Sequence, residues 1–276
     1  VIMNQEYVNL SQINLKFSNH ILWLTLNRPD SSNAFTDEMI DELVSALYRA
    51  DEDDNVRAII VTGSGKHFCA GGDVKAMKDK TQMFAGESNE LRQRYKRGIQ
   101  QIPICMNSLS TPVIAMINGA AIGAGLDFAC MCDIRISSNR AKFGETFTKL
   151  GLIPGDGGTY FLQRVVGFAK AMELTLTADV IDASEAKAIG LVSTLYEAQA
   201  LKEATERLAL KVISNAPIAT QMAKRALTHA YNSDLQSNLD LLSAYQGITQ
   251  RSSDHFSALD NLLEKKNSKV SDFKHL

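Results

Sequence analysis

Two glycine-rich turns, each placed directly after a short apolar run, constrain the fold of this chain more than any other feature. The first turn covers residues 63–74 and follows the run 58–61; the second covers residues 118–127 and follows the run 113–117. Short apolar runs rich in β-branched residues are typical of buried strands. A strand that ends in small residues leaves backbone N–H groups directed into open space. If the two turns are adjacent, their amides can hold one negatively charged oxygen between them.

Strand and helix patterns alternate through the first half of the chain. Residues 13–17 and 21–26 alternate in the manner of strands, and Thr36 is a typical N-cap for a helix that ends near Asp51. We expect further strands at 57–62, 112–117 and 133–137, and further helices at 88–108 and 123–131. This alternation predicts an α/β fold with parallel strands that are joined by helices.

From residue 159 onward the pattern becomes mostly helical. Four amphipathic helices are expected at 198–214, 217–231, 235–249 and 253–265, and Pro217 suits the first turn of the second one. We therefore divide the chain into a core of residues 1–200 and a C-terminal helical region of residues 201–276. The apolar faces of these helices can pack either on their own core or against another subunit.

Composition excludes several classes of protein. The chain has 276 residues, of which 45% are hydrophobic and 22% charged, and its net charge is -2, so we expect no nucleic-acid partner. No apolar stretch approaches the roughly 18 residues of a membrane span, and residues 1–5 do not resemble a signal peptide. The four cysteines lack metal-site spacing, which indicates reduced thiols, a cytoplasmic location and no bound metal: Cys69, Cys105, Cys130 and Cys132.

Two other glycine motifs can be rejected. The glycines at 119, 123 and 125 do not have the spacing of a dinucleotide-binding loop. The segment Gly63-Ser64-Gly65-Lys66 lacks the Lys-Ser/Thr ending of a phosphate-binding P-loop. Neither turn therefore predicts a nucleotide cofactor.

The two turns and four other segments together resemble the crotonase superfamily of enoyl-CoA hydratases and isomerases. The resemblance extends from about residue 12 to the C-terminus, and the motifs follow the order of the family. The four other segments are 26–35, 131–137, 143–145 and 151–159. The resemblance implies a spiral of repeated ββα units, followed by a helical C-terminal region that forms homotrimers or dimers of trimers.

The resemblance also implies a substrate class and a set of backbone donors. Members of the superfamily bind acyl-CoA thioesters and stabilise a thioester enolate with two backbone N–H groups, which map to Gly72 and Ala124. It places CoA near Arg28 and Ala70, and it places Lys265 near the CoA of a neighbouring subunit. It implies no cofactor apart from the CoA of the substrate.

The acid–base positions differ from the pattern of the hydratases. Hydration of a 2-enoyl thioester needs groups that take a proton from water and deliver one to the α-carbon. The first hydratase glutamate maps to Asp127, and the second maps to Phe147, which cannot transfer a proton. Glu145 can reach the site if its segment is extended, but it points elsewhere if the segment is helical. Asp156 either contributes a further carboxyl or only bonds within its own turn.

Three functions agree with these residues. The first is an enoyl-CoA hydratase, which is the commonest activity of the superfamily. The second is a double-bond isomerase, because one carboxyl can move a proton between two carbons and Phe147 removes the second. The third is an acyl-CoA-binding protein with little turnover, which keeps the two amides but lacks a complete acid–base pair.

Overall fold

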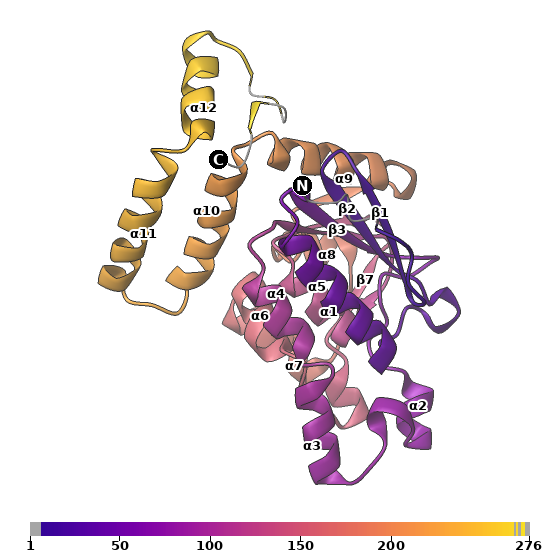
Figure 1. Cartoon of the computed structure of the whole chain (residues 1–276). Helices are drawn as coiled ribbons and strands as arrows, with labels where there is room; N and C mark the ends of the chain where they lie inside the picture. The colour runs from indigo at the N-terminus through magenta and orange to yellow at the C-terminus, as the bar shows by residue number, and fades with distance from the viewer. Residues whose placement is uncertain (1–6, 268, 270–271, 274–276) are drawn as a thin grey trace.

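A computed structural model describes residues 7–267, 269 and 272–273 of the protein (Figure 1). The segment 1–5, for which the sequence predicts no signal peptide, lies outside the described residues. Within the described part of the chain, no helix has the length and apolar character needed to cross a membrane.

A six-stranded sheet forms the centre of the fold. Its first two strands are antiparallel and the remaining ones are parallel, as the alternation of strands and helices predicts. The order is β1 (Ile13–Ser18), β2 (Ile21–Leu26), β3 (Ala58–Gly63), β4 (Val113–Ile117), β6 (Ile134–Ser138) and β9 (Thr194–Tyr196). Each parallel pair is connected by a helical crossover, so the α/β prediction is confirmed.

A second, smaller sheet is formed by segments that follow strands of the large sheet in the chain. It contains β5 (Ala121–Ile122), β7 (Lys142–Gly144) and β8 (Val180–Asp182). Two isolated parallel bridges continue its ladder, one between Phe35 and Gly72 and one between Cys69 and Ala121. The two glycine turns therefore carry the chain from adjacent strands of the large sheet to adjacent positions of the small one. This repetition is the spiral that the resemblance implies.

Helices surround these sheets (Figure 1). Thr36 accepts a hydrogen bond from the Met39 amide at 3.1 Å, so the capped helix that the sequence predicts is confirmed. The helices of the core are α1 (Asp37–Asp51), α2 (Val74–Asp79), α3 (Ser88–Arg97), α4 (Gln101–Ser108), α5 (Ala124–Met131), α6 (Gly158–Val166), α7 (Phe168–Thr177) and α8 (Ala183–Ala188).

The single helix predicted over 88–108 is wrong. The structure divides this segment at Gly98 into α3 and α4. Pro103 explains the break, because proline has no N–H to donate and is tolerated only in the first turn of a helix. A helix that contains Pro103 must begin shortly before it, and α4 begins at Gln101.

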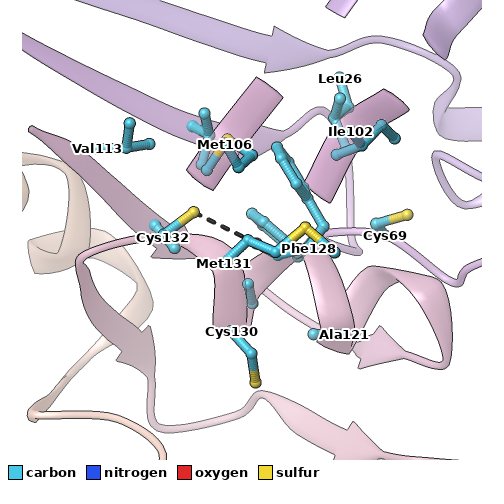
Figure 2. Close-up of a cluster of buried hydrophobic side chains, with 14 of the residues drawn as sticks. Leu26, Cys69, Ile102, Met106, Val113, Ala121, Phe128, Cys130, Met131 and Cys132 are labelled. Atoms are coloured by element: carbon cyan, nitrogen blue, oxygen red, sulfur yellow. Dashed lines mark hydrogen bonds between the residues drawn. The ribbon is translucent and has the colours of Figure 1, made fainter. Parts of the chain in front are cut away.

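The α5 helix lies at the centre of the core, and all of its residues are buried. The Phe128 ring packs against the rings of Phe35 and Phe68, with centroid distances of 5.9 and 6.1 Å. Figure 2 shows Phe128 and Met131 among these apolar side chains. The four cysteines are free and buried, as expected. Burial raises the pKa of the Cys69 thiol to about 12, so it stays protonated at neutral pH.

Four helices form the C-terminal region: α9 (Ala198–Ile213), α10 (Pro217–Ala230), α11 (Leu235–Thr249) and α12 (Ser253–Leu263). The division that we expect after residue 200 falls inside α9. This helix packs on the large sheet, because Leu201 and Ile213 share a buried cluster with Ile60 and Trp23. In contrast, α11 and α12 stand away from the core (Figure 1).

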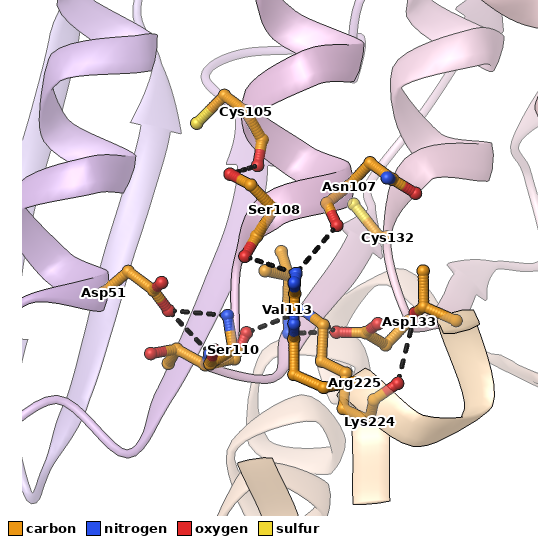
Figure 3. A network of polar contacts seen from close by, with 12 residues as sticks. Asp51, Cys105, Asn107, Ser108, Ser110, Val113, Cys132, Asp133, Lys224 and Arg225 are labelled. Carbon is orange, nitrogen blue, oxygen red and sulfur yellow. Dashed lines mark hydrogen bonds and ion pairs between the residues drawn. The ribbon is translucent and has the colours of Figure 1, made fainter. Parts of the chain in front are cut away.

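A polar network attaches α10 to the core (Figure 3). The Lys224 Nζ atom donates to the Thr111 carbonyl at 2.8 Å and pairs with Asp133, also at 2.8 Å. Arg225 donates to the Ser108 carbonyl, the last residue of α4, at 2.8 Å. These contacts place cations at the carboxyl end of a helix, where they stabilise its exposed carbonyl groups.

Candidate active site

The structure brings the two glycine turns into contact. Gly71 has a φ of +86°, a conformation that glycine adopts without strain. A Cβ atom at Gly71 would lie 2.7 Å from the Ile122 carbonyl oxygen and 3.1 Å from the Ala124 nitrogen. Any side chain at Gly71 would therefore force the two turns apart.

Gly72 and Ala124 both line one small cavity beside this contact. Ala124 is the first residue of α5, so its N–H has no carbonyl partner one turn earlier. Among the described residues, neither the Gly72 amide nor the Ala124 amide donates a backbone hydrogen bond. Two residues from different elements that line the cavity therefore have backbone N–H groups without a backbone acceptor. The other lining residues are Phe35, Met77, Met83, Phe84, Tyr95, Ile99, Phe147 and Asp156.

Three carboxyl groups gather beside this cavity. Asp127 lies in the first turn of α5, Glu145 directly follows β7, and Asp156 lies in the turn before α6. Their exposed fractions are 0%, 1% and 4%. The Asp127 carboxyl lies close enough to those of Asp156 and Glu145 to influence their pKa values. Among the described residues, no N–H or hydroxyl donor reaches the oxygens of Asp127 or Glu145, so a hydrogen bond between two of these carboxyls requires that one of them is protonated.

Burial makes the three carboxyl groups hold protons more strongly than exposed ones. It raises the pKa of Asp127 well above its usual range, and the charges of Asp156 and Glu145 raise it further. Burial raises the pKa of Glu145 to about 8, and it also raises the pKa of Asp156. Like charges this close cannot all ionise. The cluster therefore retains protons at a pH where exposed carboxyls have lost theirs, which allows it to act as an acid in catalysis.

The three carboxyls differ in their position relative to the cavity. Asp156 lines it together with Gly72, Ala124 and Phe147, whereas Asp127 lies close to Asp156. Phe147 begins the short 3-10 helix η3 (Phe147–Leu150), two residues after Glu145. A Cβ atom at Gly123 would lie 3.7 Å from the Phe147 ring. An aromatic ring thus lies near the Ala124 amide.

The residues expected to contact CoA lie at two separate places. Arg28 donates to the Ala34 carbonyl at 2.6 Å and pairs with Asp73 at 3.8 Å, beside the first glycine turn. Ala70 belongs to the same turn, and its amide donates to the Ser32 carbonyl. Lys265 follows α12, and Figure 1 places α12 at the end of the molecule opposite α2 and α3. Within one chain, Lys265 is therefore not brought to the cavity.

Comparisons with known proteins identify the family. The family profile described as Enoyl-CoA hydratase/isomerase matches residues 16–273. The chain belongs to the enoyl-CoA hydratase/isomerase family. It is 34% identical to the short-chain-enoyl-CoA hydratase of Clostridium acetobutylicum, over 97% of this chain and 100% of that protein. It is 34% identical to the 1,2-epoxyphenylacetyl-CoA isomerase of Escherichia coli, over 89% and 93%. The crystal structure of enoyl-CoA hydratase from Bacillus anthracis superposes with a TM-score of 0.87 at 32% identity, covering 96% and 100% of the two chains.

Membership of the enoyl-CoA hydratase/isomerase family confirms the resemblance to the crotonase superfamily, but two parts of this site were not predicted from the sequence. One is the mutual contact of the three carboxyls. The sequence feature that could have indicated this contact is the pair Gly157-Gly158 directly after Asp156. Gly158 packs directly on the Asp127 carboxyl, where a side chain would not fit. The other is Tyr95 of α3, which lines the cavity and lies near Asp156. Within the described residues, no group of three or more His, Cys, Asp or Glu side chains could hold a metal ion.

Proposed function

We propose that this protein is an enoyl-CoA hydratase, which adds water to the double bond of a 2-trans-enoyl-CoA. The observation that carries the proposal is that Gly72 and Ala124 share one cavity with the buried carboxyl of Asp156. The backbone amides of Gly72 and Ala124 donate no backbone hydrogen bond among the described residues. The names of the relatives and the family profile also support it.

The two amides stabilise the charge that forms during addition. The thioester oxygen accepts hydrogen bonds from the Gly72 and Ala124 N–H groups, and it gains negative charge as the enolate forms. The amino-terminal end of α5 favours the same charge. Removal of one donor of this kind typically costs about 3–4 kcal/mol of transition-state stabilisation.

The cluster of Asp127, Glu145 and Asp156 transfers the protons of the reaction. The water oxygen bonds to C3, its proton passes to an ionised carboxylate, and C2 of the enolate takes a proton from a protonated carboxyl. Asp156 is the carboxyl at the cavity wall, and Asp127 and Glu145, which lie close to it, exchange protons with it. The net change is the addition of one water, so the cluster returns to its starting state. These proton transfers use no cofactor apart from the CoA of the substrate.

A second candidate function is the isomerisation of a 3-enoyl-CoA to a 2-enoyl-CoA. Phe147 supports it, because this ring lines the cavity at the position of the second hydratase glutamate. One carboxylate can take the C2 proton and return it to C4 while the two amides hold the enolate. The E. coli relative named an isomerase agrees with this alternative.

Two substrates separate these functions. A hydratase removes the ultraviolet absorbance of the conjugated thioester in a 2-enoyl-CoA, and we expect this result. An isomerase creates that absorbance from a 3-enoyl-CoA and leaves the 2-enoyl-CoA intact. A binding protein does neither but retains acyl-CoA on a column. Absence of both reactions, in a protein that still binds acyl-CoA, would contradict an enzymatic function.

We also propose that the protein forms a homotrimer or a dimer of trimers through α10, α11 and α12. Large apolar side chains on these helices are exposed in one chain, among them Leu227, Leu235 and Leu263 at 73%, 74% and 79%. Exposed apolar surface of this kind is typical of subunit interfaces. In such an assembly, Lys265 would reach the CoA of a neighbour, while Arg28 and Ala70 contact the CoA of their own subunit. Light scattering during size-exclusion chromatography measures the assembly, and a monomer would contradict the proposal.

The cellular setting follows from the same chemistry. We propose a cytoplasmic location, which the four free and buried cysteines support, since reduced thiols are usual in that compartment. The proposed partners are the acyl-CoA substrate and further copies of the chain, with neither nucleic acid nor membrane among them. Fractionation of cells with an antibody to the protein tests the location.

A further inference from the structure

A second and larger cavity adjoins the small one that contains the two amides. Its volume is about 530 Å³, and it lies between α2, α3 and the end of η3. Met77, Phe84 and Tyr95 line both cavities, so the two spaces meet at these side chains. A Cβ atom at Gly72 would lie 2.4 Å from the Met77 methyl group and 3.2 Å from the Phe84 ring. The Met77 and Phe84 side chains therefore lie between Gly72 and the large cavity.

The wall of the large cavity is apolar, and its charged residues are exposed. Leu91 and Tyr95 of α3 face Leu150 and Leu152 across the space, and all four are at least partly exposed. Lys78, Lys80 and Glu87, which also line the cavity, are exposed to solvent. Leucine side chains exposed to solvent at a cavity wall are unfavourable, and an apolar ligand that covers them gains binding free energy. An uncharged hydrocarbon chain fits this wall, whereas a charged group would have no buried partner there.

Arg28 and Ala70, where CoA is expected, do not line this cavity. With a thioester oxygen held between Gly72 and Ala124, one side of the thioester carries CoA and the other carries the acyl group. The large apolar cavity therefore corresponds to the acyl side.

We propose that the enzyme prefers enoyl-CoA substrates of medium chain length, about eight carbons, over the four-carbon crotonyl-CoA. This inference rests on the proposed function, because it assumes that the two amides hold a thioester. A methylene group has about the volume of one water molecule, roughly 30 Å³, so four further carbons occupy about 120 Å³ and fit easily. The crotonyl group would leave the wall formed by Leu91, Leu150 and Leu152 uncovered. Each methylene group that becomes buried raises affinity about fourfold.

Chain-length profiles of the wild type and three variants test the inference. In the wild type, we expect kcat/KM for 2-octenoyl-CoA to exceed that for crotonyl-CoA at least about tenfold. Leu91→Trp fills the cavity from α3 and should lower the value for 2-octenoyl-CoA about tenfold while that for crotonyl-CoA changes less than about threefold. Leu150→Trp fills it from the opposite wall and should act in the same way. Leu176→Trp, on an exposed position of α7 outside the cavity, is the matched control and should change neither value.

Calorimetric binding of saturated ligands keeps the inference separate from the proposed function. We expect octanoyl-CoA to bind at least about tenfold more tightly than butyryl-CoA, and Leu91→Trp to remove the difference without weakening CoA itself. If this pattern is found but no enoyl-CoA is converted, the proposed function fails and the chain-length inference stands. Equal binding of the two ligands, or the highest kcat/KM with crotonyl-CoA, would overturn the inference. A loss of affinity for CoA alone in Leu91→Trp would show that the cavity holds the CoA arm, which also overturns it.

Discussion

The Asp127 carboxyl group occupies the space into which a side chain at Gly158 would project. A Cβ atom at Gly158 would lie 2.3 Å from Asp127 Oδ1 and 2.4 Å from Oδ2, far inside van der Waals contact. Gly158 is the first residue of α6 and follows the turn that contains Asp156. The absence of one side chain thus allows two carboxyls from different elements to meet.

Gly158→Ala should separate Asp127 from its two carboxyl partners. The new methyl group cannot be accommodated unless Asp127 or α6 moves. We expect the free energy of unfolding to fall by about 1–3 kcal/mol. We expect kcat to fall about a hundredfold, because small displacements at a catalytic site have effects of that size. Urea denaturation and steady-state kinetics measure the two quantities.

Thr159→Ala is the matched control for this variant, because Thr159 is exposed on the next position of the same helix. It should change both quantities little. Wild-type turnover in a folded Gly158→Ala protein would show that the position of Asp127 does not matter for catalysis.

Asp127→Asn should remove proton transfer while the fold is retained. The side chains have nearly the same shape, and the Asp127 carboxyl already resists ionisation because it is buried. We expect kcat to fall about 10²- to 10⁴-fold, with little change in affinity for a saturated acyl-CoA. Kinetics and calorimetry on the same preparation measure this. Unchanged turnover would exclude Asp127 from the mechanism.

The carboxyl cluster should make the protein less stable as the pH rises. Burial raises the pKa of Glu145 in the folded protein to about 8, whereas the ordinary pKa of a glutamate side chain is 4.5. Between these values the folded state binds more protons than the unfolded state, so the free energy of unfolding falls with increasing pH. Asp127 and Asp156 contribute in the same direction, because their pKa values are also raised.

Glu145→Gln should therefore flatten this decline. Denaturation midpoints measured between about pH 6 and pH 8 should decrease less steeply in the variant than in the wild type. Asp260→Asn, which changes an exposed carboxyl on α12, is the control and should keep the wild-type slope. Identical slopes for Glu145→Gln and the wild type would show that Glu145 is ionised in the folded protein.

Phe147→Glu should increase hydration relative to isomerisation. The Phe147 ring lines the cavity near the Gly123 turn, so a carboxyl there would face the same space as Asp156. A second positioned acid–base group should raise the rate of hydration at least about tenfold. Phe147→Leu tests the effect of removing the ring alone and should give no such gain. No gain from the glutamate would mean that it does not reach the water.

The sequence predicted most of the fold because its signals are local. The apolar runs before the two turns, the Thr36 cap and the amphipathic C-terminal helices each specify their own element. The break at Gly98 was missed because the apolar pattern continues across it, although Pro103 limits where α4 can begin.

The site was predictable only in part. Gly72 and Ala124 were expected to supply the amide donors because their motifs resemble those of the family, and the structure places both residues on one cavity. The contact between Asp127, Glu145 and Asp156 was not predicted, because these residues come from three separate turns of the spiral. Only the folded structure shows that Leu91 and Leu150, which are far apart in the chain, line one cavity.

A crystal structure with a bound 2-enoyl-CoA analogue tests the central claim most directly. The account predicts that the Gly72 and Ala124 nitrogens both lie within about 3.1 Å of the thioester oxygen. A thioester oxygen that contacts neither nitrogen, or only one of them, would contradict it.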